Sequence, residues 1–375
     1  SMSIYPFDPE PSTLVSTSYD TNLLLTSITP TSLIPAHTFP LQHAIHCHAI
    51  SPIPTHAPLI AAGTASPAIR LLDLRSGLAT HALPGHNGAI YSLAWSPKSE
   101  SILASGAADG RVLFFDIRRA NAAFASLDLE DAIGVTASPT SNRLGGDSGP
   151  LLNFSAQAHT GPVTSVQWTT DGPAHRSIVT AGHDQRIRVW DAATGRNELV
   201  HFGPRLKNAR LGTFGPLLLP SEAYTRKRVA EVCLWANDDA RGEVTVFGLR
   251  EGDVRGVMEV KGVQKGRVPK EREVDARRGR GRVNAMVWRV GEGANAREGL
   301  EMVSAHGDGS VGVWRVPEED YLMGDGSGRH REGAVDVGDI DGAPKKKRKR
   351  HDLGALVEGL TKIRRPDDAP GPSAR

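Results

Sequence analysis

Three short constellations of hydrogen-bonding side chains recur along this sequence. Each has a Ser or Thr, an Asp four residues later, and an aromatic residue six positions after the Asp. The members are Ser105, Asp109 and Phe115, then Thr180, Asp184 and Trp190, and finally Ser304, Asp308 and Trp314. The first two copies are also preceded by a histidine, His86 and His159. Such groups can hydrogen-bond in series, which pairs polar atoms that would otherwise be buried alone.

The residue types point to a structural role. His159, Thr180, Asp184 and Trp190 make one complete set, whereas the set of His86, Ser105 and Asp109 has lost its indole to Phe115. The sequence contains no phosphate-binding loop, no Gly-x-Ser-x-Gly elbow and no histidine pair at metal-ligand spacing. We therefore predict no catalytic, cofactor-binding or metal-binding residues, and keep a catalytic function only as the third alternative.

The elements that hold these residues are predicted to be short strands. Each constellation indicates a strand, a tight turn carrying the Asp, and a second strand, which together form a β-hairpin. A further strand ending in Trp stands upstream of each, at Trp95, Trp168 and Trp288. Weaker copies of the hairpin lie at residues 14–27, 61–73 and 235–247.

This repetition is typical of the WD-repeat β-propeller, so the predicted fold class is all-β. The aromatic-equivalent positions are 26, 72, 115, 190, 247 and 314. Several spacings exceed the usual ~40–45 residues, which places insertions near 119–156, 203–230 and 260–282. We expect the propeller to occupy residues 1–318, followed by a flexible tail over 319–375.

Closure of the ring is the difficulty in this prediction. Six hairpins are visible in the sequence, and the first lacks most of its repeat. A propeller removes its sheet edges by joining its first and last blades. The expectation is therefore an open or strained ring, in a chain that lacks an N-terminal portion or borrows its first blade.

Composition excludes several protein classes. The chain has 375 residues, and its 40 Gly and 25 Pro favour many turns over a helix bundle. The net charge is only +2, so the chain is not a polycation that binds nucleic acid over its whole surface. Two cysteines, Cys47 and Cys233, are too few for a disulfide framework and fit a reducing compartment. No apolar run reaches the ~18 residues of a membrane span.

Two stretches resemble one family in particular. Leu93-Ala-Trp95-Ser-Pro97 and Phe115-Asp116-Ile117-Arg118 lie in the first, and residues 158–203 form the second. They resemble the Cockayne syndrome group A protein and its fungal relatives. The resemblance implies a seven-bladed, non-catalytic substrate receptor of a cullin–RING ubiquitin ligase. Its implied partners are a propeller-type adaptor, a repair ATPase and a stalled RNA polymerase, in transcription-coupled nucleotide excision repair. The sequence departs from the family by lacking the first blade and the N-terminal helical segment.

Receptors of this class often carry Trp-Asp-x-Arg at a blade end. The matching positions here are Asp116 with Arg118, and Asp73 with Arg75, which become adaptor-binding candidates. The alternative is an ordinary exposed salt bridge worth ~0–1 kcal/mol. The runner-up function is a non-ligase scaffold that binds chromatin or histones.

The C-terminal part carries separate signals. A run of six cations is typical of a nuclear import signal, and predicts an import receptor as partner and the nucleus as location. Its members are Lys345, Lys346, Lys347, Arg348, Lys349 and Arg350. The alternative is a tail that contacts DNA nonspecifically.

A short amphipathic helix is expected over 353–363. Residues 261–282 contain nine Lys or Arg residues, and we expect this stretch to be disordered. Its contact with nucleic acid is expected to be weak at most.

Overall fold

The computed structural model describes the propeller region of the chain. The described residues are 1–8, 12–53, 58–119, 123–129, 156–169, 177–203, 206–208, 215–218, 232–237, 243–259, 282–289, 301–307 and 309–315. Their regular structure is entirely β-strand, and each strand pairs antiparallel with its neighbours. No helix in this part of the chain has the length and apolar character needed to cross a membrane.

Three four-stranded sheets form the first half, and we call them blades 1, 2 and 3. Blade 1 contains β1 (Met2–Ile4), β2 (Thr13–Thr17), β3 (Asn22–Ile28) and β4 (Leu33–Pro40). Blade 2 contains β5 (Ile45–Ile50), β6 (Leu59–Thr64), β7 (Ile69–Asp73) and β8 (Leu78–Leu83). Blade 3 contains β9 (Ile90–Trp95), β10 (Ile102–Ala107), β11 (Val112–Asp116) and β12 (Ala123–Ser126).

The second half repeats the same antiparallel order. Blade 4 contains β13 (Val163–Trp168), β14 (Ser177–Gly182) and β15 (Arg186–Asp191), and a single bridge joins Trp190 to Asn197. Blade 5 contains β16 (Leu217–Leu218), β17 (Val232–Ala236), β18 (Glu243–Gly248) and β19 (Val254–Glu259). Blade 6 contains β20 (Val283–Arg289), β21 (Glu301–His306) and β22 (Val311–Arg315).

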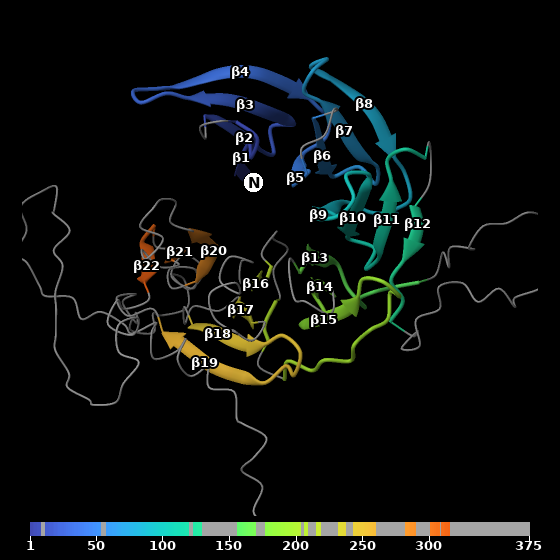
Figure 1. Ribbon diagram of the computed structural model, residues 1–375, viewed down its shortest axis with the longest axis vertical. Coiled ribbons are helices and arrows are strands. Elements are labelled where there is room, and N and C mark those ends of the chain that lie inside the picture. Colours follow the sequence, from blue (N-terminus) through green and yellow to red (C-terminus); the bar gives the residue numbers. More distant parts are fainter. Residues whose placement is uncertain are drawn as a thin grey trace, which may run out of the picture.

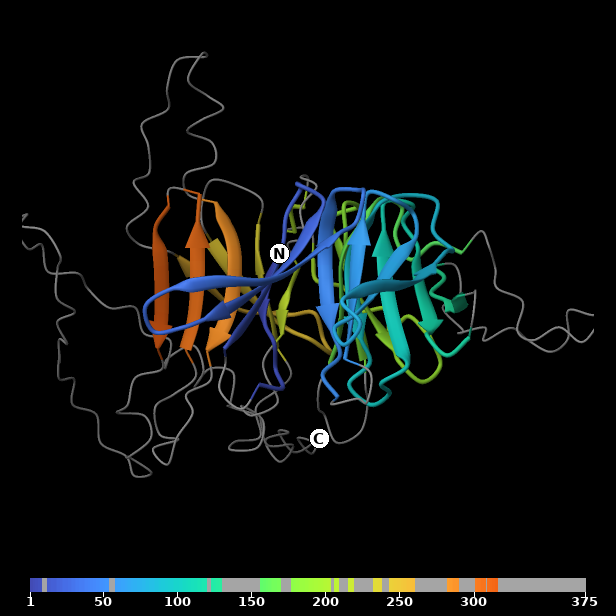
Figure 2. The same ribbon diagram turned by 90° about the horizontal axis from the view of Figure 1, so that it is seen from above.

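The six blades are arranged around an axis, which confirms the predicted β-propeller (Figure 1). The first strand of each blade lies nearest the axis and the last lies outermost, and the side view shows the strands running between two opposite faces (Figure 2). Blades 1 and 6 stand on either side of an opening in the ring of ribbons (Figure 1).

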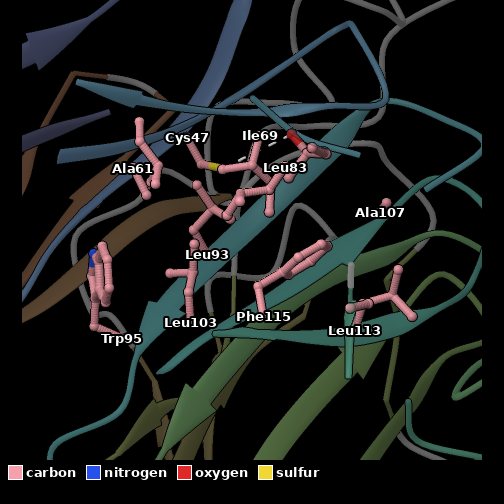
Figure 3. Packing of buried hydrophobic residues seen from close by; sticks show 13 residues of the cluster. Cys47, Ala61, Ile69, Leu83, Leu93, Trp95, Leu103, Ala107, Leu113 and Phe115 are labelled. Atoms are coloured by element: carbon pink, nitrogen blue, oxygen red, sulfur yellow. Dashed lines mark hydrogen bonds between the residues drawn. The ribbon is translucent and has the colours of Figure 1, made fainter. Parts of the chain in front are cut away.

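The core lies between consecutive blades. We call the side of a blade that faces the next blade its forward face, and the opposite side its rear face. Ala61, Ile69 and Leu71 on the forward face of blade 2 belong to the same buried cluster as Leu113 and Phe115 on the rear face of blade 3 (Figure 3). Burying a Leu, Ile or Phe side chain stabilises the fold by about 1.5–3 kcal/mol. Because side chains alternate between the two faces of a strand, a blade between two others buries apolar residues on both of its faces.

Blade 1 corrects one prediction. The sequence suggested that most of this repeat is missing, but the structure gives it four paired strands. Val15, Leu23 and Phe39 are at most 2% exposed and pack in one cluster with Ile60 of blade 2. The blade was underestimated because apolar alternation alone specifies it, without the His and Trp markers that blades 3 and 4 carry.

Parts of two predicted insertions are ordered in the structure. Residues 123–126 form β12, the outer strand of blade 3, although the sequence assigned them to the insertion near 119–156. In the insertion near 203–230, Leu206 and Asn208 are buried and residues 217–218 form β16. The third insertion, near 260–282, lies outside the described residues except for Arg282.

Candidate protein interface

The complete constellation in blade 4 forms one chain of hydrogen bonds. The Trp190 indole N–H donates to Thr180 Oγ1 at 2.9 Å, and Thr180 Oγ1 lies 2.8 Å from His159 Nε2. His159 Nδ1 lies 2.9 Å from Asp184 Oδ1. His159 Nδ1 also lies 2.6 Å from NH1 of Arg188, so this ring nitrogen stands between a carboxylate and a guanidinium.

Arg188 is a fifth member that the sequence analysis missed. Its NH1 atom lies 2.7 Å from Asp184 Oδ2, and only 13% of its side chain is exposed. Arg188 stands two residues before Trp190 on β15, so both side chains leave the strand on the same face. That period of two was the signal in the sequence that could have found it.

Burial and charge fix the ionisation of this network. Burial alone would raise the pKa of Asp184, but the hydrogen bond from His159 and the charge of Arg188 outweigh it and lower the pKa to about 2. Burial lowers the pKa of His159, which keeps the imidazole neutral near pH 7. The network therefore contains one ion pair, between Asp184 and Arg188, bridged to neutral groups.

Blade 3 brings its three predicted residues together in the same order. His86 Nε2 lies 2.7 Å from Ser105 Oγ, and His86 Nδ1 lies 3.2 Å from Asp109 Oδ2. The backbone N–H of Asn87 also donates to Asp109 Oδ2 at 2.9 Å. Phe115 is buried in the position of the indole, its ring centroid 6.4 Å from that of His86.

Blade 6 builds a different pair. Ser304 Oγ lies 3.0 Å from His306 Nε2, and both residues are buried. His306 occupies the position that Gly182 holds in blade 4, where a side chain would collide with the ring of His159. In blade 6 the imidazole thus comes from the strand itself. Asp308 lies outside the described residues, and Trp314 is placed only as a strand residue of β22 opposite Met302.

Three tryptophans at or next to the end of innermost strands connect neighbouring blades. The indole N–H of Trp95 in blade 3 donates to the carbonyl of Ala49 in blade 2 at 3.1 Å. Trp168 in blade 4 donates to Ala94 in blade 3 at 3.1 Å, and Trp288 in blade 6 donates to Leu218 in blade 5 at 2.8 Å. The sequence analysis noted these tryptophans without a role. Each one fixes the height of its blade against the blade before it.

Two of the predicted interface residues, Asp116 and Arg118, lie at the end of blade 3. Arg118 Nε and NH2 lie 2.9 and 2.7 Å from the two carboxylate oxygens of Asp116, a bidentate pair. The Arg118 side chain is 73% exposed, whereas that of Asp116 is only 6% exposed. The hydrogen bond from Arg118 is the main reason that the pKa of Asp116 is held below its ordinary value. The turn therefore presents a guanidinium whose orientation is already set.

Blade 2 carries the corresponding turn. The backbone N–H of Arg75 donates to Asp73 Oδ1 at 2.9 Å, as the N–H of Arg118 does to Asp116 Oδ1 at 3.1 Å. In blade 4 the equivalent Asp191 accepts from the N–H of Ala193 at 3.0 Å and from the Thr194 hydroxyl at 2.6 Å. The Asp thus shapes the turn in three blades, and blade 3 adds the bidentate ion pair.

The remaining predicted sites cannot be placed on this framework. The basic cluster of residues 345–350 and the expected helix over 353–363 lie outside the described residues. Within the part of the chain that the structure describes, no group of three or more His, Cys, Asp or Glu side chains is arranged to hold a metal ion.

Comparison with known sequences supports the repeat assignment directly. Residues 77–116 and 150–191 match the family model described as "WD domain, G-beta repeat". The chain carries WD40 repeats. The matched WD40 segments contain the hairpins of blades 3 and 4, which are the two blades with a His, hydroxyl and Asp network.

Several curated proteins are similar to parts of the chain. The WD repeat-containing protein ATCSA-1 of Arabidopsis thaliana is 31% identical over 214 residues, covering 44% of this chain and 47% of that protein. The ribosome biogenesis protein ytm1 of Aspergillus terreus is 32% identical, covering 49% of this chain and 36% of ytm1. The histone acetyltransferase type B subunit 2 of Debaryomyces hansenii is 30% identical, covering 44% of this chain and 36% of that subunit. The chain spans less than half the length of these relatives.

Proposed function

We propose that this propeller is a non-catalytic receptor subunit of a cullin–RING ubiquitin ligase that acts in transcription-coupled nucleotide excision repair. The observation that carries the proposal is the turn at the end of blade 3, where buried Asp116 holds the exposed guanidinium of Arg118 in a bidentate pair. The similarity to ATCSA-1 of Arabidopsis and the resemblance to the Cockayne syndrome group A family support the same role.

The physical argument concerns preorganisation. A free arginine loses side-chain freedom on binding, at a cost of about 0.5–1.5 kcal/mol for a long side chain. Asp116 has already fixed Arg118, so less of this cost falls on the complex. The partner in this proposal is a propeller-type adaptor that offers carboxylates or backbone carbonyls to the exposed edge of the guanidinium.

The other proposed partners follow from the same family resemblance. They are a repair ATPase, a stalled RNA polymerase and, for the basic cluster of residues 345–350, an import receptor that brings the chain to the nucleus. Replacing that cluster by neutral residues in a large fluorescent fusion would leave the fusion in the cytoplasm if this import route operates.

The adaptor role is tested by affinity capture from nuclear extract. The wild-type chain is expected to retain the ligase adaptor, and Arg118→Ala is expected to weaken this binding ten- to a hundredfold, the equivalent of about 1.5–3 kcal/mol. Arg119→Ala is the matched control, because Arg119 is equally exposed at 71% and lies 3.8 Å from the same Asp116. Equal capture by wild type and Arg118→Ala would remove this arginine from the interface.

A chromatin scaffold is the second candidate, and the similarity to the histone acetyltransferase type B subunit 2 of Debaryomyces hansenii favours it. The same capture experiment separates the two. Histones recovered without the ligase adaptor would favour the scaffold.

A further inference from the structure

The innermost strands of blades 2, 3, 4 and 6 share a β-bulge at their second residue. In each of them the register with the next strand skips one position. The residues left without a partner in the ladder are His46, Tyr91, Thr164 and Asn284. A bulge redirects a side chain out of the regular alternation of its strand. These four residues therefore stand at the same end of the strands that lie nearest the axis (Figure 1).

Blades 2 and 3 place aromatic rings at this position. The ring centroid of His46 lies 5.2 Å from that of Tyr91, at an interplanar angle of 58°. The same imidazole lies 5.5 Å from the ring of Tyr19, at an angle of 74°. Tyr19 belongs to the turn between β2 and β3 of blade 1 and is 75% exposed, whereas His46 and Tyr91 are partly buried. Three consecutive blades thus contribute one ring each to a group that we call the aromatic row.

Blades 4 and 6 carry polar residues at the corresponding position. Thr164 is 1% exposed, and its Oγ1 accepts from Nδ2 of Asn208 at 3.0 Å. Asn284 Oδ1 accepts from Nε of Arg282 at 2.8 Å. These two positions are thus hydrogen-bonded within the chain, whereas the aromatic row reaches solvent at Tyr19.

The charges around the aromatic row favour a cation. Residues 1–69 contain no Lys or Arg. Asp20, next to Tyr19, is exposed, and its Oδ1 accepts from the backbone N–H of Asn22 at 3.1 Å. Burial lowers the pKa of His46, so its imidazole is neutral near pH 7 and adds no positive charge. The negative faces of the rings and the carboxylate of Asp20 therefore attract a positive group together.

We propose that the aromatic row binds one arginine side chain from an extended segment of a partner protein. A guanidinium is planar and weakly hydrated, so it stacks on aromatic rings more readily than an ammonium group does. Its N–H groups can donate to the carboxylate of Asp20 at the same time. Single-stranded nucleic acid also stacks on aromatic rings, but its phosphates require a positively charged groove, and residues 1–69 supply no Lys or Arg.

This site is separate from the turn that carries Arg118. Tyr91 stands where β9 begins, at the end of the sheet that holds the turn of Asp109. Asp116 and Arg118 follow the opposite end of β11, and the strands run between two opposite faces of the molecule (Figure 2). The arginine site and the Arg118 turn therefore lie on different faces, and the inference does not depend on the ligase role.

Fluorine NMR of the full chain labelled with fluorotyrosine reports on the site directly. The chain has five tyrosines, and Tyr5 is the internal control, because it contacts Phe7 beyond the other end of an innermost strand. The probe is a capped Gly-Ala-Arg-Ala-Gly peptide, compared with the same peptide carrying citrulline, which keeps the shape of arginine without its charge. The arginine peptide should shift the Tyr19 and Tyr91 resonances saturably. The citrulline peptide should bind at least about fivefold more weakly.

Matched variants, read at the Tyr91 resonance, separate the contributions. Tyr19→Leu removes an exposed ring without disturbing the core, and should weaken binding of the arginine peptide about three- to tenfold. Tyr5→Leu removes a ring of the same type at the opposite face and should leave the affinity unchanged. Asp20→Asn keeps an acceptor for the N–H of Asn22 but loses the charge, so it should weaken binding about two- to threefold and reduce its salt dependence.

Four results would overturn the proposal. One is a spectrum that does not change, or in which Tyr5 shifts as much as Tyr19 and Tyr91. Another is equal affinity for the arginine and citrulline peptides. A third is an oligothymidylate that shifts the two resonances at lower concentration than the arginine peptide, which would assign the rings to base stacking. The last is a change in both resonances when residues 345–350 are replaced by neutral residues before any peptide is added, which would assign the site to the chain's own tail.

Discussion

Blades 3 and 4 start from the same three residue types and complete them differently. In both, a histidine joins a hydroxyl on the second strand to an Asp in the following turn. They differ at two positions of the third strand. Blade 4 has Arg188 and Trp190, which extend the polar network, and blade 3 has Leu113 and Phe115, which are buried in the apolar cluster shared with blade 2.

This difference shows which part of the repeat is essential to the local fold. In both blades, hydrogen bonds among the His, the hydroxyl and the Asp pair the polar groups of the turn and of the end of the sheet. The two later positions decide whether the rear face also contains a charge. Blade 4 therefore depends on its ion pair, because a charge that loses its partner in a buried site costs several kcal/mol. Blade 3 depends on the hydrogen bonds of Asp109 and on apolar packing.

The largest expected effect comes from removing the central Asp in each blade. Asp184→Ala should reduce the free energy of unfolding by about 3–5 kcal/mol, because it leaves the nearly buried Arg188 without its carboxylate. Asp109→Ala should cost less, about 1–3 kcal/mol, because it removes the hydrogen bonds to His86 and to the backbone N–H of Asn87. Urea denaturation followed by circular dichroism measures both. Equal losses would mean that Arg188 does not make blade 4 more dependent on its Asp.

Acid should act on the same ion pair with a smaller effect, since protonation removes the charge of Asp184 but keeps its side chain. Its pKa of about 2 lies below the ordinary value of 3.8, so the folded state binds a proton less readily than the unfolded state. The stabilisation is complete above pH 4 and is lost as the pH falls toward 2. Unfolding midpoints measured across this range should decline less in Arg188→Leu, whose Asp184 has lost the cation. An identical decline in both proteins would contradict the assignment.

Replacing the indole should have a moderate effect. Trp190→Phe gives blade 4 the ring of blade 3 and removes the N–H that donates to Thr180 Oγ1, at a cost of about 1–2 kcal/mol. A double-mutant cycle with Thr180→Val isolates this bond, with an expected coupling near 1 kcal/mol. Additive effects of the two substitutions would show that the indole contributes packing alone.

The sequence predicted those parts of the fold that local patterns encode. Hairpins with an Asp in the turn were found because alternation and turn chemistry act over about ten residues. The inner and outer strands of blade 1, the outer strand β12 and the short β16 were missed, because such strands carry no marker residues and are held by their neighbours.

The contacts between blades were harder to predict for a different reason. Trp95 and Trp168 donate to main-chain carbonyls 46 and 74 residues away, and any residue type supplies a carbonyl. The bidentate pair of Asp116 and Arg118 is local, so its spacing was enough to propose it as a site.

The smallest expected effect concerns the turn after each Asp. Gln185 in blade 4 has a φ of 59°, and Gly110 in blade 3 has a φ of 77° at the equivalent position. This left-handed conformation is unfavourable for a residue with a Cβ, so Gln185→Gly should stabilise the protein by about 0.5–1 kcal/mol. The reciprocal change, Gly110→Gln, should destabilise it by more, because the new Cβ would also meet the carbonyl oxygen of His159. Thermal and urea unfolding of the two variants give the sign of each effect. A loss of stability in Gln185→Gly would mean that the extra freedom of glycine in the unfolded chain outweighs the strain of this turn.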